Sequence, residues 1–140
     1  LQKEIANFYC EMAARELMQS RPADARPHLV QALAHHRLCV RANLLLGDVE
    51  RDLGNRPAAI AAWQRIESQN PAYLSLVAER LLKAYRDDER ADEGLNLLRG
   101  YLEKYASVDL LDTVYQATLA GSGAAAAYRL VRDEVRRTPT

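Results

Sequence analysis

Residues 46–71 read LGDVERDLGNRPAAIAAWQRIESQNP, and this stretch decides the fold. Gly47 and Ala59 are predicted to lie where two helices cross, because larger side chains would push the helices apart. Gly54 can adopt the left-handed backbone conformation that ends a first helix, and Pro71 stops a second one. The stretch therefore predicts two antiparallel helices joined by a tight turn.

The same arrangement recurs along the chain. Small residues stand at Ala25, Ala59, Gly94 and Ala127, at spacings of 34, 35 and 33 residues. A period of about 34 residues is that of tetratricopeptide (TPR) repeats, in which each repeat is a helix–turn–helix unit. The sequence predicts an all-α TPR α-solenoid, a single array over 1–140 with about four repeats in a right-handed superhelix. The expected repeats are 6–39, 40–73, 75–107 and 108–140.

The apolar period supports eight helices and no strand. They are predicted at 2–18, 24–38, 41–53, 56–68, 73–87, 91–105, 108–120 and 124–137. Pro27 would lie deep in a helix that began at Pro22, so we expect that helix to begin near Asp24 or to be loosened in its first turn. Two residues suit the start of the helix at 56–68, namely Asn55 as its cap and Pro57 in its first turn. Pro139 is expected to end the fourth repeat.

The composition excludes several classes of function. Nineteen basic residues balance nineteen acidic ones, which gives no basic footprint for nucleic acid and no polybasic attraction to a membrane. Two cysteines fit a reducing compartment better than a disulfide framework. No apolar run is long enough to span a bilayer, so we expect this stretch to be soluble. Because the chain opens at Leu1 in the middle of a helical pattern, we expect it to be a piece of a longer protein.

Stacked helix pairs curve so that the first helix of each pair lines a concave face. This geometry predicts a protein-binding groove of mixed charge, suited to a polar peptide or a folded partner. An ordinary solvated face would have the same composition, and the sequence leaves both interpretations open. The groove-facing residues are Asn7, Cys10, Ala14, Arg41, Leu44, Asp48, Arg51, Asp52, Glu79, Lys83, Arg86, Asp87, Asp112 and Gln116.

Motifs for catalysis, cofactors or metal are absent. The sequence holds no phosphate-binding glycine loop, CxxC pair, HExxH or nucleophile elbow. His36 and Cys39 could supply two ligands, but a structural zinc site needs four. Cys10 is interpreted as a small buried packing residue, with a reactive thiol as the weaker alternative. We therefore predict a protein that is not an enzyme, with no metal and no cofactor in these residues.

One segment is more specific than the repeat class. Residues 2–11, QKEIANFYCE, resemble the segment that opens the later repeats of the lipopolysaccharide assembly protein B (LapB/YciM) family of Gram-negative bacteria. The resemblance continues loosely through 132–139 and corresponds to the C-terminal part of the family's TPR region. The chain would cover well under half of such a protein.

The resemblance implies an adaptor at the cytoplasmic face of the bacterial inner membrane. It implies that the whole protein has an N-terminal anchor and a C-terminal rubredoxin-like metal-binding domain. It also implies that the protease FtsH and the deacetylase LpxC are partners, with the adaptor promoting degradation of LpxC and so limiting lipopolysaccharide synthesis. Cys10 and Cys39 do not match the family's metal ligands. The oligomeric state stays open, a homodimer included.

Two other functions compete with the adaptor. Similar arrays form the protein-interaction arm of N-acetylglucosaminyltransferase-like glycosyltransferases, which would require a catalytic domain outside these residues. A co-chaperone clamp for an acidic peptide tail would need a lysine and an asparagine in the positions held here by Cys10 and Ala14. Their absence argues against the clamp.

Overall fold

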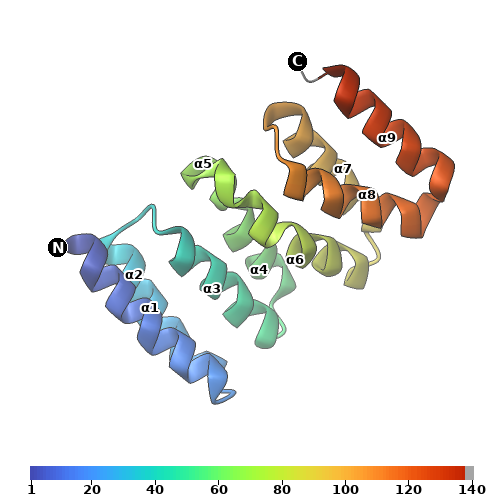
Figure 1. Cartoon of the computed structure of the whole chain (residues 1–140). Helices are drawn as coiled ribbons and strands as arrows, with labels where there is room; N and C mark the ends of the chain where they lie inside the picture. Colours follow the sequence, from blue (N-terminus) through green and yellow to red (C-terminus); the bar gives the residue numbers. More distant parts are fainter. Residues whose placement is uncertain (138–140) are drawn as a thin grey trace. The chain divides into compact units, whose positions relative to one another are not determined.

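Every regular element in the part of the chain that the structure describes, residues 1–137, is a helix (Figure 1). The structure is a computed structural model. Its elements are α1 (Gln2–Met18), α2 (Pro22–His35), α3 (Val40–Asp52), α4 (Arg56–Gln64), α5 (Ile66–Gln69), the 3-10 helix η1 (Pro71–Tyr73), α6 (Leu74–Asp87), α7 (Ala91–Lys104), α8 (Val108–Ser122) and α9 (Ala124–Arg137). Consecutive helices pack as pairs: α1 with α2, α3 with α4, α6 with α7, and α8 with α9. The predicted all-α class of paired helices is confirmed.

The chain divides into two compact units, the first spanning Leu1–Tyr73 and the second beginning at Leu74. The predicted single array and its right-handed superhelix stay predictions. None of the helices formed by residues 1–137 is long and apolar enough to cross a membrane. The expected stop at Pro139 lies outside the described residues.

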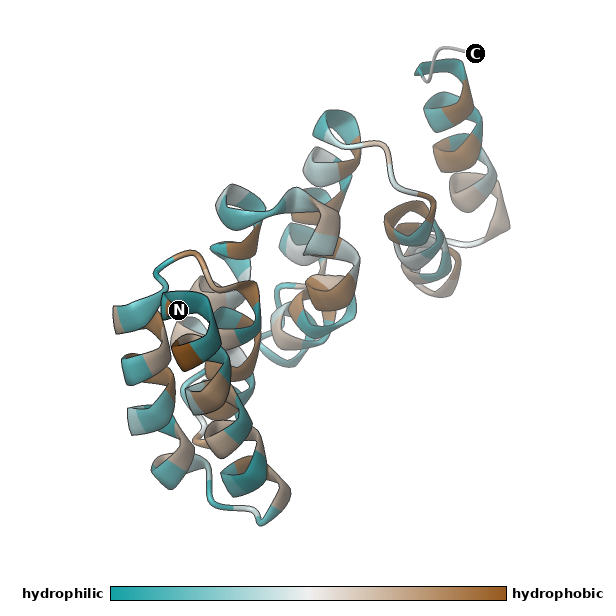
Figure 2. Cartoon of the chain, turned by 60° about the vertical axis from the view of Figure 1, so that its left-hand side comes forward, coloured by the Kyte–Doolittle hydropathy of each residue, from teal (hydrophilic) through white to brown (hydrophobic). Residues whose placement is uncertain are grey.

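Small side chains bring the helices of the first unit close together. α1 buries Ala6, Cys10 and Ala13 on one face, and this face packs against α2 and α3. Figure 2 shows hydrophilic and hydrophobic segments alternating along the helices, as expected for helices with one buried and one exposed side. The side chains are small at the contact, so the helix axes can approach closely.

The α3–α4 crossing is built around one tryptophan. Trp63 is 1% exposed, and its Nε1 donates a hydrogen bond to the carbonyl oxygen of Leu44 at 3.2 Å. A Cβ added to Gly47 would lie 2.0 Å from that nitrogen. Gly54 has a φ of +82°, in the left-handed region, and this conformation ends α3, the first helix of the pair. The predicted roles of both glycines are confirmed.

The second unit repeats this plan with different residues. α6 buries an apolar face and exposes a polar one, and Gly94 of α7 packs against Tyr85 of α6. A Cβ at Gly94 would lie 2.8 Å from the Cβ of Tyr85. The four residues predicted at the crossings are all buried, namely Ala25, Ala59, Gly94 and Ala127.

Four local predictions differ from the structure, and two of them concern the bounds of α2. α2 begins at Pro22, not near Asp24, because a proline in the first helical position needs no N–H partner. The ring of Pro27 is exposed, so water can reach the carbonyl that it leaves unpaired. α2 also ends at His35, three residues early, since His36 is extended.

The helix predicted at 56–68 is interrupted at Arg65, between α4 and α5. There the Ser68 hydroxyl donates to the Arg65 carbonyl at 2.9 Å and competes with the backbone. Asn55 stands at the N-cap of α4 but makes no side-chain cap hydrogen bond. Instead, its side-chain nitrogen Nδ2 donates a hydrogen bond to Glu50 Oε2 at 3.1 Å.

Candidate protein-binding surface

Charged residues at helical spacing form the polar face of α6. Glu79, Lys83 and Arg86 recur at intervals of four and three residues and are all exposed. The opposite face of α6 is buried, which fixes the helix in this orientation. Asp112 and Gln116 are exposed one turn apart on α8, and α8 packs against α6. Five of the six predicted groove residues of the second unit therefore face one another from two neighbouring helices, and the sixth, Asp87, is the last residue of α6.

These five side chains line one cleft of about 350 Å³, which we call the α6–α8 cleft. Its remaining lining residues are Leu82, Thr113, Ala117 and Ala120. Short side chains on α8 leave the space, while longer charged side chains surround it. A second depression of about 300 Å³ adjoins it, sharing Leu82 and Arg86 and reaching α7.

Two polar side chains of the α6–α8 cleft have partners among the described residues. Lys83 Nζ lies 2.9 Å from Asp87 Oδ2, and the Thr113 hydroxyl donates to the Asp109 carbonyl oxygen at 3.1 Å. Among the residues that the structure describes, the side chains of Glu79, Arg86 and Asp112 form no ion pair and no hydrogen bond. A guanidinium and two carboxylates are thus available for a ligand of mixed charge.

The charged and amide side chains predicted to line the groove in the first unit form contacts within that unit. Arg41 Nη1 donates to Asn7 Oδ1 at 2.5 Å, and Arg41 Nη2 lies 2.7 Å from Glu11 Oε1. This cluster joins the first helices of two successive pairs, α1 and α3. Because Arg41 already has two partners, a ligand would have to compete for it.

Arg51 is also engaged. Its guanidinium lies 3.5 Å from Asp48 Oδ1 and 3.2 Å from Asp52 Oδ1, and it stands over the ring of Trp63 at 6.0 Å. Both carboxylates belong to α3 itself, and of these contacts the one with Trp63 reaches α4. Arg51 is therefore part of the structure of its helix pair as well as of the surface.

Cys10 is fully buried and does not reach the surface of the first unit. Its sequence interpretation as a packing residue agrees with this placement. Within residues 1–137, no group of three or more His, Cys, Asp or Glu side chains could hold a metal ion.

Sequence reasoning missed one buried polar cluster. Glu50 is 7% exposed, and Arg26 donates to both of its carboxylate oxygens, at 2.8 and 3.0 Å. The hydrogen bonds and charge of Glu50 raise the pKa of Arg26. The pair ties α2 to α3. No local pattern marks it, because its members lie on different helices.

The comparisons with known proteins point in one direction. The chain is similar to lipopolysaccharide assembly protein B of Escherichia coli K12 and of Escherichia coli O157:H7. In each case 26% of 137 aligned residues are identical, covering 98% of this chain and 35% of the relative. The chain thus spans about a third of the length of these relatives. No family model matches it. The resemblance seen in residues 2–11 extends over nearly the whole chain, and the chain is similar throughout to one stretch of lipopolysaccharide assembly protein B.

Proposed function

We propose that the chain is a protein-binding repeat module of the TPR type that acts in lipopolysaccharide assembly and binds its partner in the α6–α8 cleft. The unpaired Glu79, Arg86 and Asp112 around this cleft are the observation that carries the proposal. The similarity to lipopolysaccharide assembly protein B supplies the process. The module acts by holding proteins and carries out no reaction of its own.

The chemistry of the α6–α8 cleft favours a polar peptide segment with both signs of charge. Arg86 can take a carboxylate in a bidentate contact, while Glu79 and Asp112 can take lysine or arginine side chains. Gln116 adds an amide that can bond to a peptide backbone. Pairs of opposite charge across an interface determine the specificity and the association rate of a complex more than its affinity.

The finer part of the proposal concerns the complete protein. There the module lies on the cytoplasmic side of the bacterial inner membrane and holds the deacetylase LpxC, the protease FtsH or both. By bringing them together it promotes degradation of the deacetylase and limits lipopolysaccharide synthesis. The family resemblance supports this assignment.

The test reverses one charge in the full-length protein and compares it with a matched control. Arg86 and Arg15 are both exposed, and each stands in the last turn of its helix. Arg86→Glu and Arg15→Glu should therefore lose similar amounts of helix-dipole stabilisation, on the order of 0.3–1 kcal/mol. Only Arg86 lines the α6–α8 cleft.

In a host that lacks its own copy of the protein, we expect Arg86→Glu to raise the level of the deacetylase and of lipopolysaccharide. Arg15→Glu should restore normal levels. Immunoblots of the deacetylase and melting curves of both purified variants provide the readout. Normal deacetylase levels with Arg86→Glu, at equal stability, would exclude the α6–α8 cleft as the working surface.

A further inference from the structure

Helices α7 and α9 both pack against α8, and a cleft of about 560 Å³, which we call the α7–α9 cleft, lies between them. Most of its lining residues belong to these two helices, with Arg99 and Glu103 on α7 and Arg129 on α9. Its volume falls within the range of small-molecule sites, roughly 300–1,000 Å³. No described residue lines both this cleft and the α6–α8 cleft. We propose that the α7–α9 cleft binds a phosphate monoester between Arg99 and Arg129.

Arg99 and Arg129 supply positive charge from both walls of the α7–α9 cleft. Among residues 1–137, the side chains of these two arginines form no ion pair and no hydrogen bond. The Nε of Arg99 is buried, so it has lost contact with water without gaining an acceptor from the described part of the chain. A buried donor that is left unsatisfied is destabilising. A ligand oxygen in the cleft would satisfy this donor.

Carboxylates also line the α7–α9 cleft, and two of them are neutralised by arginines of α9. Glu134 is 8% exposed, and its Oε2 lies 3.2 Å from Arg137 Nη1. Asp133 Oδ1 lies 3.4 Å from Arg132 Nη2. Glu103 is exposed, and among residues 1–137 its side chain has no partner. Among the described lining residues, the cleft therefore offers a ligand two unpaired cations and one unpaired anion.

Two unpaired guanidinium groups suit a phosphate monoester better than a carboxylate. Each guanidinium presents its N–H donors in a planar fork that bonds to two oxygens at once. A single arginine therefore occupies both oxygens of a carboxylate. A phosphate monoester has three terminal oxygens and a charge of about −1.5 to −2 at neutral pH. It can thus bond to Arg99 and Arg129 together and balance the charge of both.

The other lining residues indicate what the phosphate is attached to. The Glu103 carboxylate repels a second anionic group but accepts hydrogen bonds from hydroxyl groups. Ser122, the last residue of α8, adds a hydroxyl of its own. Leu102 and Leu130 add apolar surface from the two walls. A phosphorylated sugar or polyol has this combination of groups, either as a soluble molecule or as the headgroup of a lipid.

The test adds inorganic phosphate to the isotope-labelled 140-residue chain and follows the chain by heteronuclear NMR. The Nε–H resonance of Arg99 should shift until the site is saturated, because this donor gains an acceptor. Acetate at the same concentration and ionic strength should shift it less. A resonance that phosphate leaves in place, or that acetate moves equally, would overturn the proposal.

Two further probes identify the source of the phosphate. Glycerol phosphate is a soluble monoester, and phosphatidic acid in phosphatidylcholine vesicles carries the same group on a lipid. Sedimentation of the chain with these vesicles, but not with phosphatidylcholine alone, would assign the site to a lipid headgroup. Binding of glycerol phosphate without sedimentation would assign it to a soluble molecule. Both results support the proposal, whereas binding of neither probe would overturn it.

Variants test the two arginines, with calorimetry to measure affinity for phosphate and circular dichroism to check each fold. Arg99→Lys keeps the charge but removes the planar fork, and Arg129→Gln removes the charge of an exposed residue. Each should weaken binding by about tenfold or more, because hydrogen bonds between charged groups are lost.

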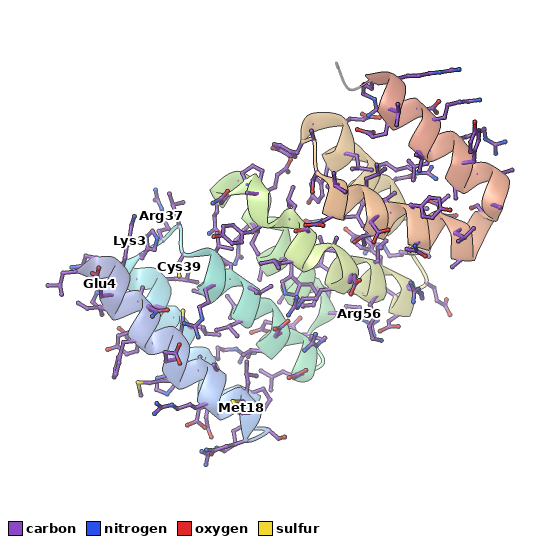
Figure 3. The ribbon with its side chains drawn as sticks, in the orientation of Figure 1. Lys3, Glu4, Met18, Arg37, Cys39 and Arg56 are labelled. Carbon is purple, nitrogen blue, oxygen red and sulfur yellow. The ribbon has the colours of Figure 1, made fainter. Side chains whose placement is uncertain are left out.

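Arg37→Gln is the matched control for Arg129→Gln. Figure 3 shows Arg37 on the loop between α2 and α3 of the first unit. Arg37 is exposed, its side chain has no partner among residues 1–137, and it does not line the α7–α9 cleft. This variant should bind phosphate as the unmodified chain does. Equal losses of affinity in Arg37→Gln and Arg129→Gln would show general charge attraction and would overturn the proposal.

Discussion

At the scale of single residues, one glycine and one tryptophan fix the α3–α4 crossing. Gly47→Ala would place a Cβ 2.0 Å from Trp63 Nε1. Trp63 is only 1% exposed and cannot move away from the added Cβ. Helices α3 and α4 must therefore separate at the crossing. We expect a loss of about 1–3 kcal/mol in the free energy of unfolding, measured by urea denaturation.

Gly100→Ala is the matched control for this substitution. Gly100 lies inside α7, and an added Cβ would meet nothing within 4 Å. Its replacement should raise stability by up to about 1 kcal/mol, because alanine favours a helix more than glycine does. A Gly47→Ala variant as stable as Gly100→Ala would show that the indole is not packed on Gly47.

The sequence predicted single residues correctly where the size or backbone conformation of that residue alone determines the local structure. Gly47, Gly54 and Ala59 were identified because a close approach or a left-handed turn admits few residue types. The contacts of Arg41 with Asn7 and of Arg26 with Glu50 could not be predicted. Such contacts depend on the rotation and offset of helices that the local sequence does not specify.

At the scale of elements, two turns depend on a left-handed glycine. Gly54 follows α3 with a φ of +82°, and Gly123 follows α8 with a φ of +87°. Replacing either with alanine should cost about 1–2 kcal/mol, because a Cβ clashes with the backbone in this conformation. Asparagine should cost less than alanine at Gly54, since it tolerates the left-handed helical region. It should not do so at Gly123, because a φ of 87° with a ψ of 176° is a conformation that essentially only glycine adopts. Thermal melts of the four variants would test this, and equal melting temperatures for alanine and asparagine at position 54 would contradict it.

Helix existence was easier to predict than helix ends. The apolar period located α1 and α9 with the bounds observed, Gln2–Met18 and Ala124–Arg137. The start of α2 was misplaced because Pro27 was expected to disrupt the first turn. The ring of Pro27 is exposed to water, and so is Ala23, whose carbonyl the proline leaves without an N–H donor. The interruption at Arg65 was missed because the apolar pattern continues through it.

At the scale of the whole molecule, the surface was predicted as one groove, but its two halves differ. Five of the six predicted residues of the second unit line the α6–α8 cleft, and within the described residues Glu79, Arg86 and Asp112 have no side-chain partner. Those of the first unit bond to one another. A list of exposed polar positions cannot make this distinction, because it depends on which side chains already satisfy each other across helices.

The central claim is that the α6–α8 cleft holds a protein partner, and photo-crosslinking inside cells tests it most directly. The photoreactive residue p-benzoylphenylalanine would replace Gln116, which lines the α6–α8 cleft. In a second strain it would replace Gln31, an exposed glutamine of α2. Both substitutions are made in the full-length protein. We predict that irradiation joins the protein from position 116, and not from position 31, to the deacetylase LpxC or the protease FtsH, as identified by mass spectrometry. Crosslinks to neither partner from position 116, or equal yields from both positions, would contradict the assignment.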